Sequence, residues 1–185
     1  MRVIAGKYRG RKLKSPPSFD TRPTSDRLRE TLFNILAPRS EDARFLDLCA
    51  GTGAVGIEAL SRGAASVTFV DRSRKMVALV AANVESLDVT NAKIEIVAAG
   101  AMEFLRRHLN QQAEPFDIIF FDPPYAEDYE AVLGFVGEHA AEMVQPDGIV
   151  IVEHHRKKLL PDEPPLERYR ELKQGDSVLS FFRAR

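Results

Sequence analysis

Cysteine is nearly absent from this sequence, with Cys49 the only one among 185 residues. A single cysteine excludes an intramolecular disulfide and a cysteine-rich zinc site. No apolar stretch is long enough to span a membrane, and residues 1–5 lack the apolar run of a secretory signal. These absences predict a cytoplasmic protein whose function involves neither a membrane nor a metal.

Net charge is also low, at −1, but it is unevenly distributed. Residues 1–39 contain ten Lys and Arg and only three acidic residues, which gives them a charge of +7 and leaves −8 for the rest. A basic arm on an acidic body indicates a polyanionic partner at one end of the molecule. A solvated basic tail is the alternative interpretation.

The order of apolar and polar residues predicts alternating strands and helices. Residues 2–14 could form a short hairpin, and Thr24 or Ser25 can cap a helix that ends at Leu36. Strands are predicted at 44–48, 66–70, 93–97, 116–121 and 148–152, and helices at 54–62, 74–87, 101–109 and 129–144. The segments 168–172 and 178–182 flank a Gly-Asp turn and predict a closing hairpin.

This repetition predicts an α/β fold with a doubly wound, mostly parallel sheet. We expect one domain over 1–185, in which 1–39 form the basic extension and helix, and 40–185 the catalytic core. Ligands of such sheets bind beyond the carboxyl ends of the strands. Residues that follow the first four strands are therefore the candidates for a site.

A glycine turn follows the first strand. Gly51 and Gly53 allow a sharp bend and a close ligand approach, and the next helix offers free N–H groups. Asp71 ends the second strand and can accept the hydroxyls of a ribose. A turn without a ligand, and a helix-capping role for Asp71, are the structural alternatives. The pattern indicates a nucleoside-containing cofactor, either NAD or S-adenosylmethionine.

Asp47 favours the second of these cofactors. Its carboxylate precedes Gly51 by four residues and would lie beneath the ligand. A carboxylate there repels a pyrophosphate and attracts an ammonium or sulfonium group. Cys49, in the same turn, is interpreted as a small buried residue and not as a reactive thiol.

The fourth strand ends in Asp122-Pro123-Pro124-Tyr125. Two prolines make a stiff turn and leave backbone carbonyls free to accept hydrogen bonds. Asp122 and the Pro123 carbonyl could each accept one N–H of an aromatic amine, and Tyr125 could stack on the base. A purely structural turn is the alternative. This arrangement indicates methylation of an exocyclic amine.

The wider pattern resembles the bacterial 16S rRNA (guanine-966-N2) methyltransferase family, of the RsmD type. The resemblance is carried by the turn after the first strand, by Asp71, by Asp122-Pro123-Pro124-Tyr125 and by three further segments, at 2–13, 21–30 and 175–181. It implies a seven-stranded class I methyltransferase sheet, S-adenosylmethionine as cofactor, and a 16S rRNA guanine in a small-subunit particle as target. We also expect the protein to act as a monomer.

Site residues are assigned on the same basis. The predicted catalytic residues are Asp122, Pro123, Pro124 and Tyr125. The predicted cofactor-binding residues are Asp47, Cys49, Ala50, Gly51, Thr52, Gly53, Asp71, Arg72, Gly100 and Ala101. The predicted RNA-binding residues are Arg2, Lys7, Tyr8, Arg9, Arg11, Lys12 and Arg22, with Tyr8 expected to stack on an exposed base.

One position departs from the family pattern. Gly100 stands where related enzymes have an aspartate that receives the adenine amino group, which leaves the Ala101 N–H, or Glu103, to bind adenine. Glu153, followed by His154 and His155, could line the guanine pocket. Three other functions remain open: a DNA adenine-N6 methyltransferase, an NAD-dependent oxidoreductase and a non-catalytic RNA-binding assembly factor.

Overall fold

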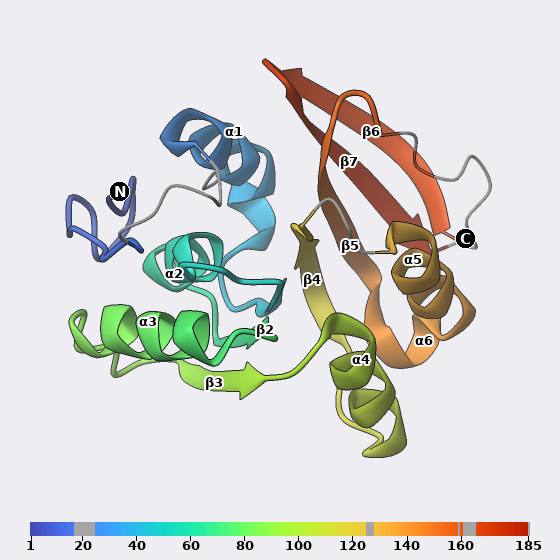
Figure 1. The fold of residues 1–185 in the computed structure, drawn as a ribbon, viewed down its shortest axis with the longest axis horizontal. Helices are drawn as coiled ribbons and strands as arrows, with labels where there is room; N and C mark the ends of the chain where they lie inside the picture. Colours follow the sequence, from blue (N-terminus) through green and yellow to red (C-terminus); the bar gives the residue numbers. More distant parts are fainter. Residues whose placement is uncertain (17–24, 125–127, 159, 161–165, 185) are drawn as a thin grey trace.

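The structure, a computed structural model, describes residues 1–16, 25–124, 128–158, 160 and 166–184. Over these residues the strands form one sheet in the order β3-β2-β1-β4-β5-β7-β6 (Figure 1). Strands β1 to β5 pair in parallel, and β7 pairs antiparallel with both β5 and β6. This order confirms the predicted doubly wound sheet and its C-terminal hairpin. The strands are β1 (Arg44–Leu48), β2 (Ser66–Asp71), β3 (Lys93–Ala98), β4 (Phe116–Phe121), β5 (Val144–His155), β6 (Leu166–Gln174) and β7 (Ser177–Ala184).

Helices cover both faces of this sheet, with α1, α2 and α3 on one side and α4, α5 and α6 on the other (Figure 1). Ser25 and Ser73 cap α1 and α3, accepting hydrogen bonds from Leu28 N at 3.1 Å and Met76 N at 3.4 Å. The helices are α1 (Asp26–Leu36), the short 3₁₀ helix η1 (Ala37–Arg39), α2 (Ala54–Ser61), α3 (Arg74–Glu85), α4 (Ala101–Asn110), α5 (Tyr129–Glu138) and α6 (Ala140–Met143).

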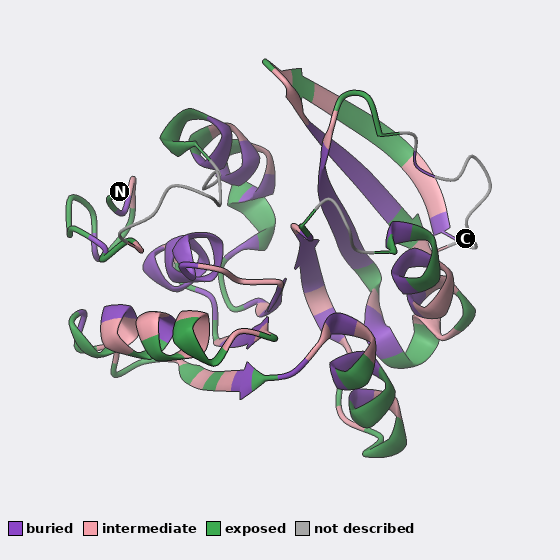
Figure 2. Ribbon diagram, viewed as in Figure 1, coloured by how far each residue is buried: buried purple, intermediate pink, exposed green. Residues whose placement is uncertain are grey.

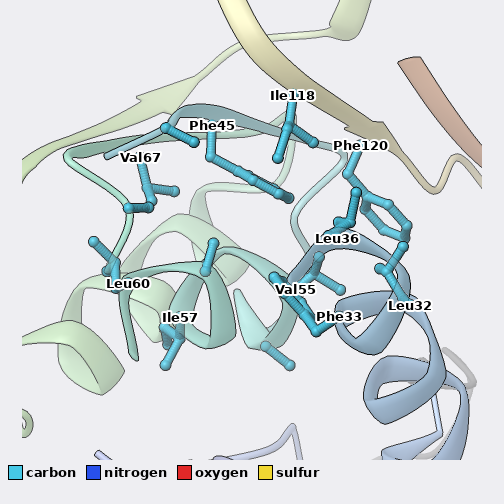
Figure 3. Close-up of a cluster of buried hydrophobic side chains, with 14 of the residues drawn as sticks. Leu32, Phe33, Leu36, Phe45, Val55, Ile57, Leu60, Val67, Ile118 and Phe120 are labelled. Atoms are coloured by element: carbon cyan, nitrogen blue, oxygen red, sulfur yellow. The ribbon is translucent and has the colours of Figure 1, made fainter. Parts of the chain in front are cut away.

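Strand residues alternate between two apolar clusters, one on each face. In β1, Phe45 packs in the cluster beneath α1 and α2, whereas Leu46 and Leu48 pack in the opposite cluster. Figure 3 shows Phe45 and Ile118 of the sheet facing Phe33 of α1 within the first cluster. Both faces of the central strands are therefore buried, as Figure 2 shows.

The predicted helix over 129–144 is correct only in its first part. Helix α5 ends at Glu138, α6 is a single turn, and β5 begins at Val144, four residues earlier than expected. Val144 is buried and pairs with Phe116, and a bulge follows before Ile118 pairs with Ile149. Strand pairing determines the conformation here, and Pro146 could not continue a helix.

The N-terminal segment is neither a free tail nor a regular hairpin. Residues 1–14, here called the strap, form a single antiparallel bridge between Arg2 and Lys12. Val3, Tyr8 and Leu13 belong to the buried cluster shared with α1 and α2. The predicted short hairpin is therefore present in irregular form. Three backbone hydrogen bonds join its arms, from Val3 N to Arg11 O at 3.0 Å, from Gly10 N to Val3 O at 2.9 Å and from Leu13 N to Met1 O at 3.1 Å.

Buried polar groups of α2 attach the strap to the body. The Glu58 carboxylate is fully buried and accepts hydrogen bonds from Ile4 N at 2.8 Å and Ala5 N at 3.0 Å. Ser61 Oγ accepts from Tyr8 N at 3.0 Å and donates to the carbonyl of Ala5. The strap backbone therefore obtains on α2 the hydrogen bonds that it lacks within itself.

Glu58 also neutralises a buried arginine. Arg29 of α1 is fully buried, and its Nε lies 3.7 Å from a Glu58 oxygen, while its Nη2 bonds Asp26 at 3.1 Å. Burial lowers the pKa of the Arg29 guanidinium, and the two carboxylates oppose that shift. Arg62 Nε donates to Glu58 at 2.9 Å. One carboxylate therefore joins the strap, α1 and α2.

Within the described residues, no helix combines the length and the apolar composition that crossing a membrane requires.

Replacing Glu58 by Gln should lower the free energy of unfolding by roughly 3–5 kcal/mol, because it removes the buried one of the two carboxylates that compensate the Arg29 charge. Guanidinium titration followed by circular dichroism measures this change. Glu85→Gln, at an exposed position of α3, is the matched control and should change stability by less than about 0.5 kcal/mol. Equal effects of the two substitutions would contradict the assigned role of Glu58.

Candidate active site

One cavity of about 530 Å³ opens at the carboxyl ends of the parallel strands. Sheets of this class bind their ligands at this edge. Its wall includes residues that follow or end each of the five strands: 49–52 after β1, 71–73 at and after β2, 99–101 after β3, 122–124 after β4 and 153–155 of β5. The predicted glycine turn and the predicted catalytic turn therefore face one shared space.

The glycine turn has the sharp bend that its sequence predicts. Gly51 and Gly53 have positive φ angles of 54° and 76°, and Gly53 caps α2 in the left-handed conformation. Cys49 also has a positive φ, of 67°, and is half-buried on the cavity wall. The prediction of a buried cysteine is thus only partly correct, and the bend begins at Cys49, two residues before Gly51.

Asp71 organises this turn. One of its oxygens accepts a hydrogen bond from Gly51 N at 2.9 Å, and the other accepts from Ser73 N at 2.8 Å. The carboxylate lines the cavity and retains lone pairs for further donors. Arg72, exposed, lies beside it on the cavity wall. Asp71 therefore both braces the loop and offers an acceptor to a ligand.

Asp47 is the buried carboxylate of the site. It is 2% exposed, and its oxygen accepts a hydrogen bond from Gly56 N at 2.8 Å. Burial raises the pKa of Asp47 to about 7; the Gly56 bond lowers it, and the negative charge of Asp71 adds to the rise. A cationic ligand in the cavity would favour the ionised form of this side chain.

The end of β3 presents backbone and small side chains to the cavity. Gly100 and Ala101 line it at the start of α4, where N–H groups are available to a ligand. Glu103 turns back toward the Gly100 N–H, at 3.4 Å, and is absent from the cavity wall. Of the two predicted adenine partners, the geometry favours the Ala101 N–H over Glu103.

Asp122, Pro123 and Pro124 form the cavity wall after β4. The Asp122 N–H bonds the carbonyl of Leu48 at 3.3 Å, which keeps this turn beside β1. Tyr129 OH donates to the Pro123 carbonyl at 3.4 Å. A carbonyl oxygen has two lone pairs, so the Pro123 carbonyl can accept a second hydrogen bond. The predicted stacking residue Tyr125 lies outside the described residues.

The end of β5 completes the cavity with polar residues. Glu153 is 8% exposed and lines the wall beside His154 and His155. His154 Nε2 lies 2.9 Å from Ser180 Oγ, and burial lowers the pKa of His154. Within the described part of the chain, no cluster of three His, Cys, Asp or Glu residues could bind a metal.

The strap places its basic side chains outward. Exposed positions carry Arg2, Lys7, Arg9, Arg11 and Lys12. Arg11 donates to the carbonyl of Ser86, which ties it to the end of α3.

Tyr8 requires a correction, because its side chain is 8% exposed and packs in the core. The predicted stacking of Tyr8 on an exposed base is therefore wrong. Arg22 lies outside the described residues.

Sequence reasoning missed Asn83 of α3. This buried amide accepts a hydrogen bond from Lys14 N at 2.7 Å and donates to the carbonyls of Lys14 and Thr52, both at 3.1 Å. It therefore links the strap to the glycine turn. A lone polar residue on the apolar side of a helix was the available signal. Pro16, Ser25 and Leu28 also line the cavity and were not predicted.

Comparison with known proteins identifies relatives over nearly the full chain. Residues 1–183 match the family described as Conserved hypothetical protein 95. Ribosomal RNA small subunit methyltransferase D of Escherichia coli (strain K12) is 39% identical over 165 residues, which cover 89% of this chain and 79% of that protein. The chain is also similar to a solved structure of a hypothetical protein from Thermus thermophilus, with a TM-score of 0.81, 32% identity and coverage of 98% of both chains.

A more distant likeness concerns the fold alone. A SAM-dependent methyltransferase from Agrobacterium tumefaciens superimposes with a TM-score of 0.57 and 24% identity, over 71% of this chain and 44% of that one.

Asp47 should make stability depend on pH. Its pKa in the folded protein, about 7, lies above the ordinary value of 3.8. Its contribution is therefore fully present below about pH 4 and is lost as pH rises through about 7. The Asp47→Asn variant cannot titrate at this position, so it does not lose this contribution. The free energy of unfolding of the variant, minus that of the wild type, should therefore rise by several kcal/mol between these two pH values, because one pKa unit corresponds to about 1.4 kcal/mol.

Urea titrations without cofactor at intervals across this pH range measure the difference. Asp147→Asn, at an exposed position, is the control and should show no such trend. A constant difference between the Asp47→Asn variant and the wild type would contradict the assigned environment of Asp47.

Proposed function

This chain belongs to the Conserved hypothetical protein 95 family, and from that premise we propose that it is an S-adenosylmethionine-dependent methyltransferase of small-subunit ribosomal RNA. The proposed target is the exocyclic N2 amine of a guanine, guanine 966 of 16S rRNA, within a small-subunit particle. Residues 1–185 would act as one domain and as a monomer. The E. coli relative, named as a small-subunit ribosomal RNA methyltransferase, supports this proposal.

A single observation carries the proposal. One cavity of about 530 Å³ contains both the glycine turn with Asp71 and the turn with Asp122 and Pro123. Pockets of several hundred Å³ accommodate a small-molecule ligand. A donor at one end and a base at the other would thus meet without intervening protein. A nicotinamide-dependent reductase would leave the Asp122 turn without a role.

The residues present fit S-adenosylmethionine. A Cβ added at Gly51 or at Gly100 would meet no protein atom within 4 Å, so both backbones face open space in the cavity wall. Asp71 offers an acceptor for ribose hydroxyls, and Asp47 offers a carboxylate for positive charge. When bound, the cofactor supplies a methyl group already activated on a sulfonium.

Asp122 and the Pro123 carbonyl then act on the substrate amine. Each accepts one N–H, which holds the nitrogen with its lone pair directed along the cavity toward the glycine turn. Asp122 stabilises the positive charge that develops on this nitrogen and accepts the proton it releases. Positioning alone can lower the barrier by roughly 7–11 kcal/mol, so the chemistry requires no covalent nucleophile.

The strap is proposed to contact the RNA backbone. Its outward Lys and Arg side chains suit phosphate contacts without sequence readout. The cavity wall includes Pro16, just after the strap, and Leu28 of α1, so the strap ends near the rim of the cavity. The target base must leave its stack to enter the cavity.

Methyl transfer to ribosomal RNA tests this function directly. Small-subunit particles from a strain lacking this protein should accept tritiated methyl groups from S-adenosylmethionine when the protein is added. Mapping of the modified nucleotide should find N2-methylguanosine at position 966. Methylation of adenine in DNA, nicotinamide-dependent reduction, or failure to bind S-adenosylmethionine in calorimetry would each contradict the proposal.

Asp122→Ala should retain cofactor binding and lose most methyl transfer, by roughly a hundredfold or more, because it removes one acceptor of the amine and the proton. Isothermal calorimetry with S-adenosylmethionine and single-turnover methylation separate the two effects. The control is Asp147→Ala, at an exposed position of β5. Asp117→Ala is less suitable, because the Asp117 carboxylate accepts a hydrogen bond from Arg44 N at 2.8 Å. Near-normal turnover by Asp122→Ala would remove this residue from the mechanism.

Arg9→Ala with Lys12→Ala should weaken RNA binding and leave cofactor affinity unchanged. Losing two phosphate contacts should reduce the slope of log K against log salt by roughly 1.4–1.8. Filter binding of small-subunit RNA across a salt series measures the slope. Arg106→Ala with Arg107→Ala removes equal charge from α4, on the other face of the sheet, and should change the slope less. Equal slopes for the two double variants would contradict the strap's assigned role.

A further inference from the structure

Two carboxylates lie side by side at the catalytic end of the cavity. The last residue of β4, Phe121, pairs with Val152 of β5. The next residue along each strand is acidic, Asp122 after Phe121 and Glu153 after Val152. Adjacent strands are about 4.8 Å apart, so two side chains of this register are close neighbours.

Both carboxylates also fall on the same face of the sheet. Ile118 and Phe120 of β4 and Ile151 of β5 pack in the cluster beneath α1. Alternation places residue 122 and residue 153 on that same face. Both line the cavity, and Glu153 is 8% exposed. Both carboxylates therefore lie on the wall of one cavity, where each could accept a hydrogen bond from the same ligand.

The surrounding residues define what this pair would bind. His154, the next residue of β5, is directed to Ser180 instead. Gln174 and Ser177, at the turn between β6 and β7, line the same end of the cavity and can donate hydrogen bonds. The catalytic end therefore offers two adjacent carboxylate acceptors and, beside them, donors suited to a carbonyl oxygen.

Guanine is the base whose edge matches this arrangement. Beside its N2 amine lies N1–H, a second donor, followed by the carbonyl O6. Beside the amines of adenine and cytosine lies a ring nitrogen that only accepts, and a carboxylate there would face a lone pair. We infer that Glu153 is the residue that selects guanine, by accepting N1–H while Asp122 accepts from the amine.

This inference rests on the proposed function and extends it from methyl transfer to the choice of base. A charged acceptor makes a stronger bond to N1–H than a neutral one does. A site built around such a bond discriminates against an analogue that lacks the donor, because the ring nitrogen of that analogue presents a lone pair to the carboxylate. Glu153 thus accounts for selection of the base, and Asp122 for the reaction at its amine.

The test compares guanosine with 2-aminopurine at the mapped nucleotide. Both carry the 2-amino group, but N1 of 2-aminopurine accepts a hydrogen bond and does not donate one. Small-subunit particles assembled on ligated ribosomal RNA would carry either base, and kcat/KM would be measured from tritiated S-adenosylmethionine. The wild type should prefer guanosine by roughly tenfold to a hundredfold.

Glu153→Gln provides the specificity switch. Its amide can donate to N1 of 2-aminopurine, so the preference for guanosine should fall by at least about tenfold. Glu153→Asp keeps the charge and should keep the preference while lowering kcat/KM for both bases. The ratio between substrates is insensitive to the fraction of folded protein, and calorimetry with S-adenosylmethionine reports the state of the cofactor end.

The outcomes separate cleanly. A wild-type enzyme that methylates 2-aminopurine as well as guanosine overturns the inference, whether or not the variants fold. An unchanged ratio in Glu153→Gln, with both substrates slowed equally, also overturns it and assigns Glu153 a structural role. A wild-type protein that methylates neither RNA overturns the proposed function, and this inference with it.

Discussion

Parallel strand pairing is the constraint on which the candidate site depends. Because β1 pairs in parallel with both β2 and β4, residues that follow these strands in the sequence meet at one edge of the sheet. Asp47, Asp71, Asp122 and Glu153 come from four different strand ends or their turns, and all face one cavity. No local motif could bring them together. The sheet therefore brings residues that are distant in the sequence close together in space.

Gathering carboxylates in one cavity has an electrostatic cost that the surrounding backbone reduces. Three amide groups, Gly51 N, Ser73 N and Gly56 N, donate to Asp71 and Asp47 at 2.8–2.9 Å. Even so, burial and the charge of Asp71 raise the pKa of Asp47 to about 7. The buried Asp47 carboxylate therefore favours a ligand that brings positive charge or hydrogen-bond donors, as a sulfonium cofactor and an aromatic amine do.

The sequence predicts elements whose signals are local and fails where distant contacts decide. Strand β4 follows from its strongly apolar run, the caps of α1 and α3 follow from the capping chemistry of Ser25 and Ser73, and the turn after β1 follows from its glycines. The start of β5 does not, because pairing with Phe116 across the sheet holds Val144 in a strand. The packing of the strap could not be predicted either. The sequence shows Tyr8 only as an aromatic residue among basic ones, whereas its burial depends on Ser61 and Glu58, which are distant in the sequence and bind the strap backbone.

The division of charge along the chain has a structural counterpart. A cavity wall bearing several carboxylates repels phosphate, so a nucleic acid could not enter it backbone first. The strap carries the opposite charge outward, and Asn83 fixes it to the carbonyl of Thr52 at the rim. Phosphates would therefore be attracted to the strap and excluded from the cavity, and only an uncharged base rich in donors would be accepted inside. Under the proposed function, the basic arm and the acidic body would together orient the polyanion so that its bases face the site.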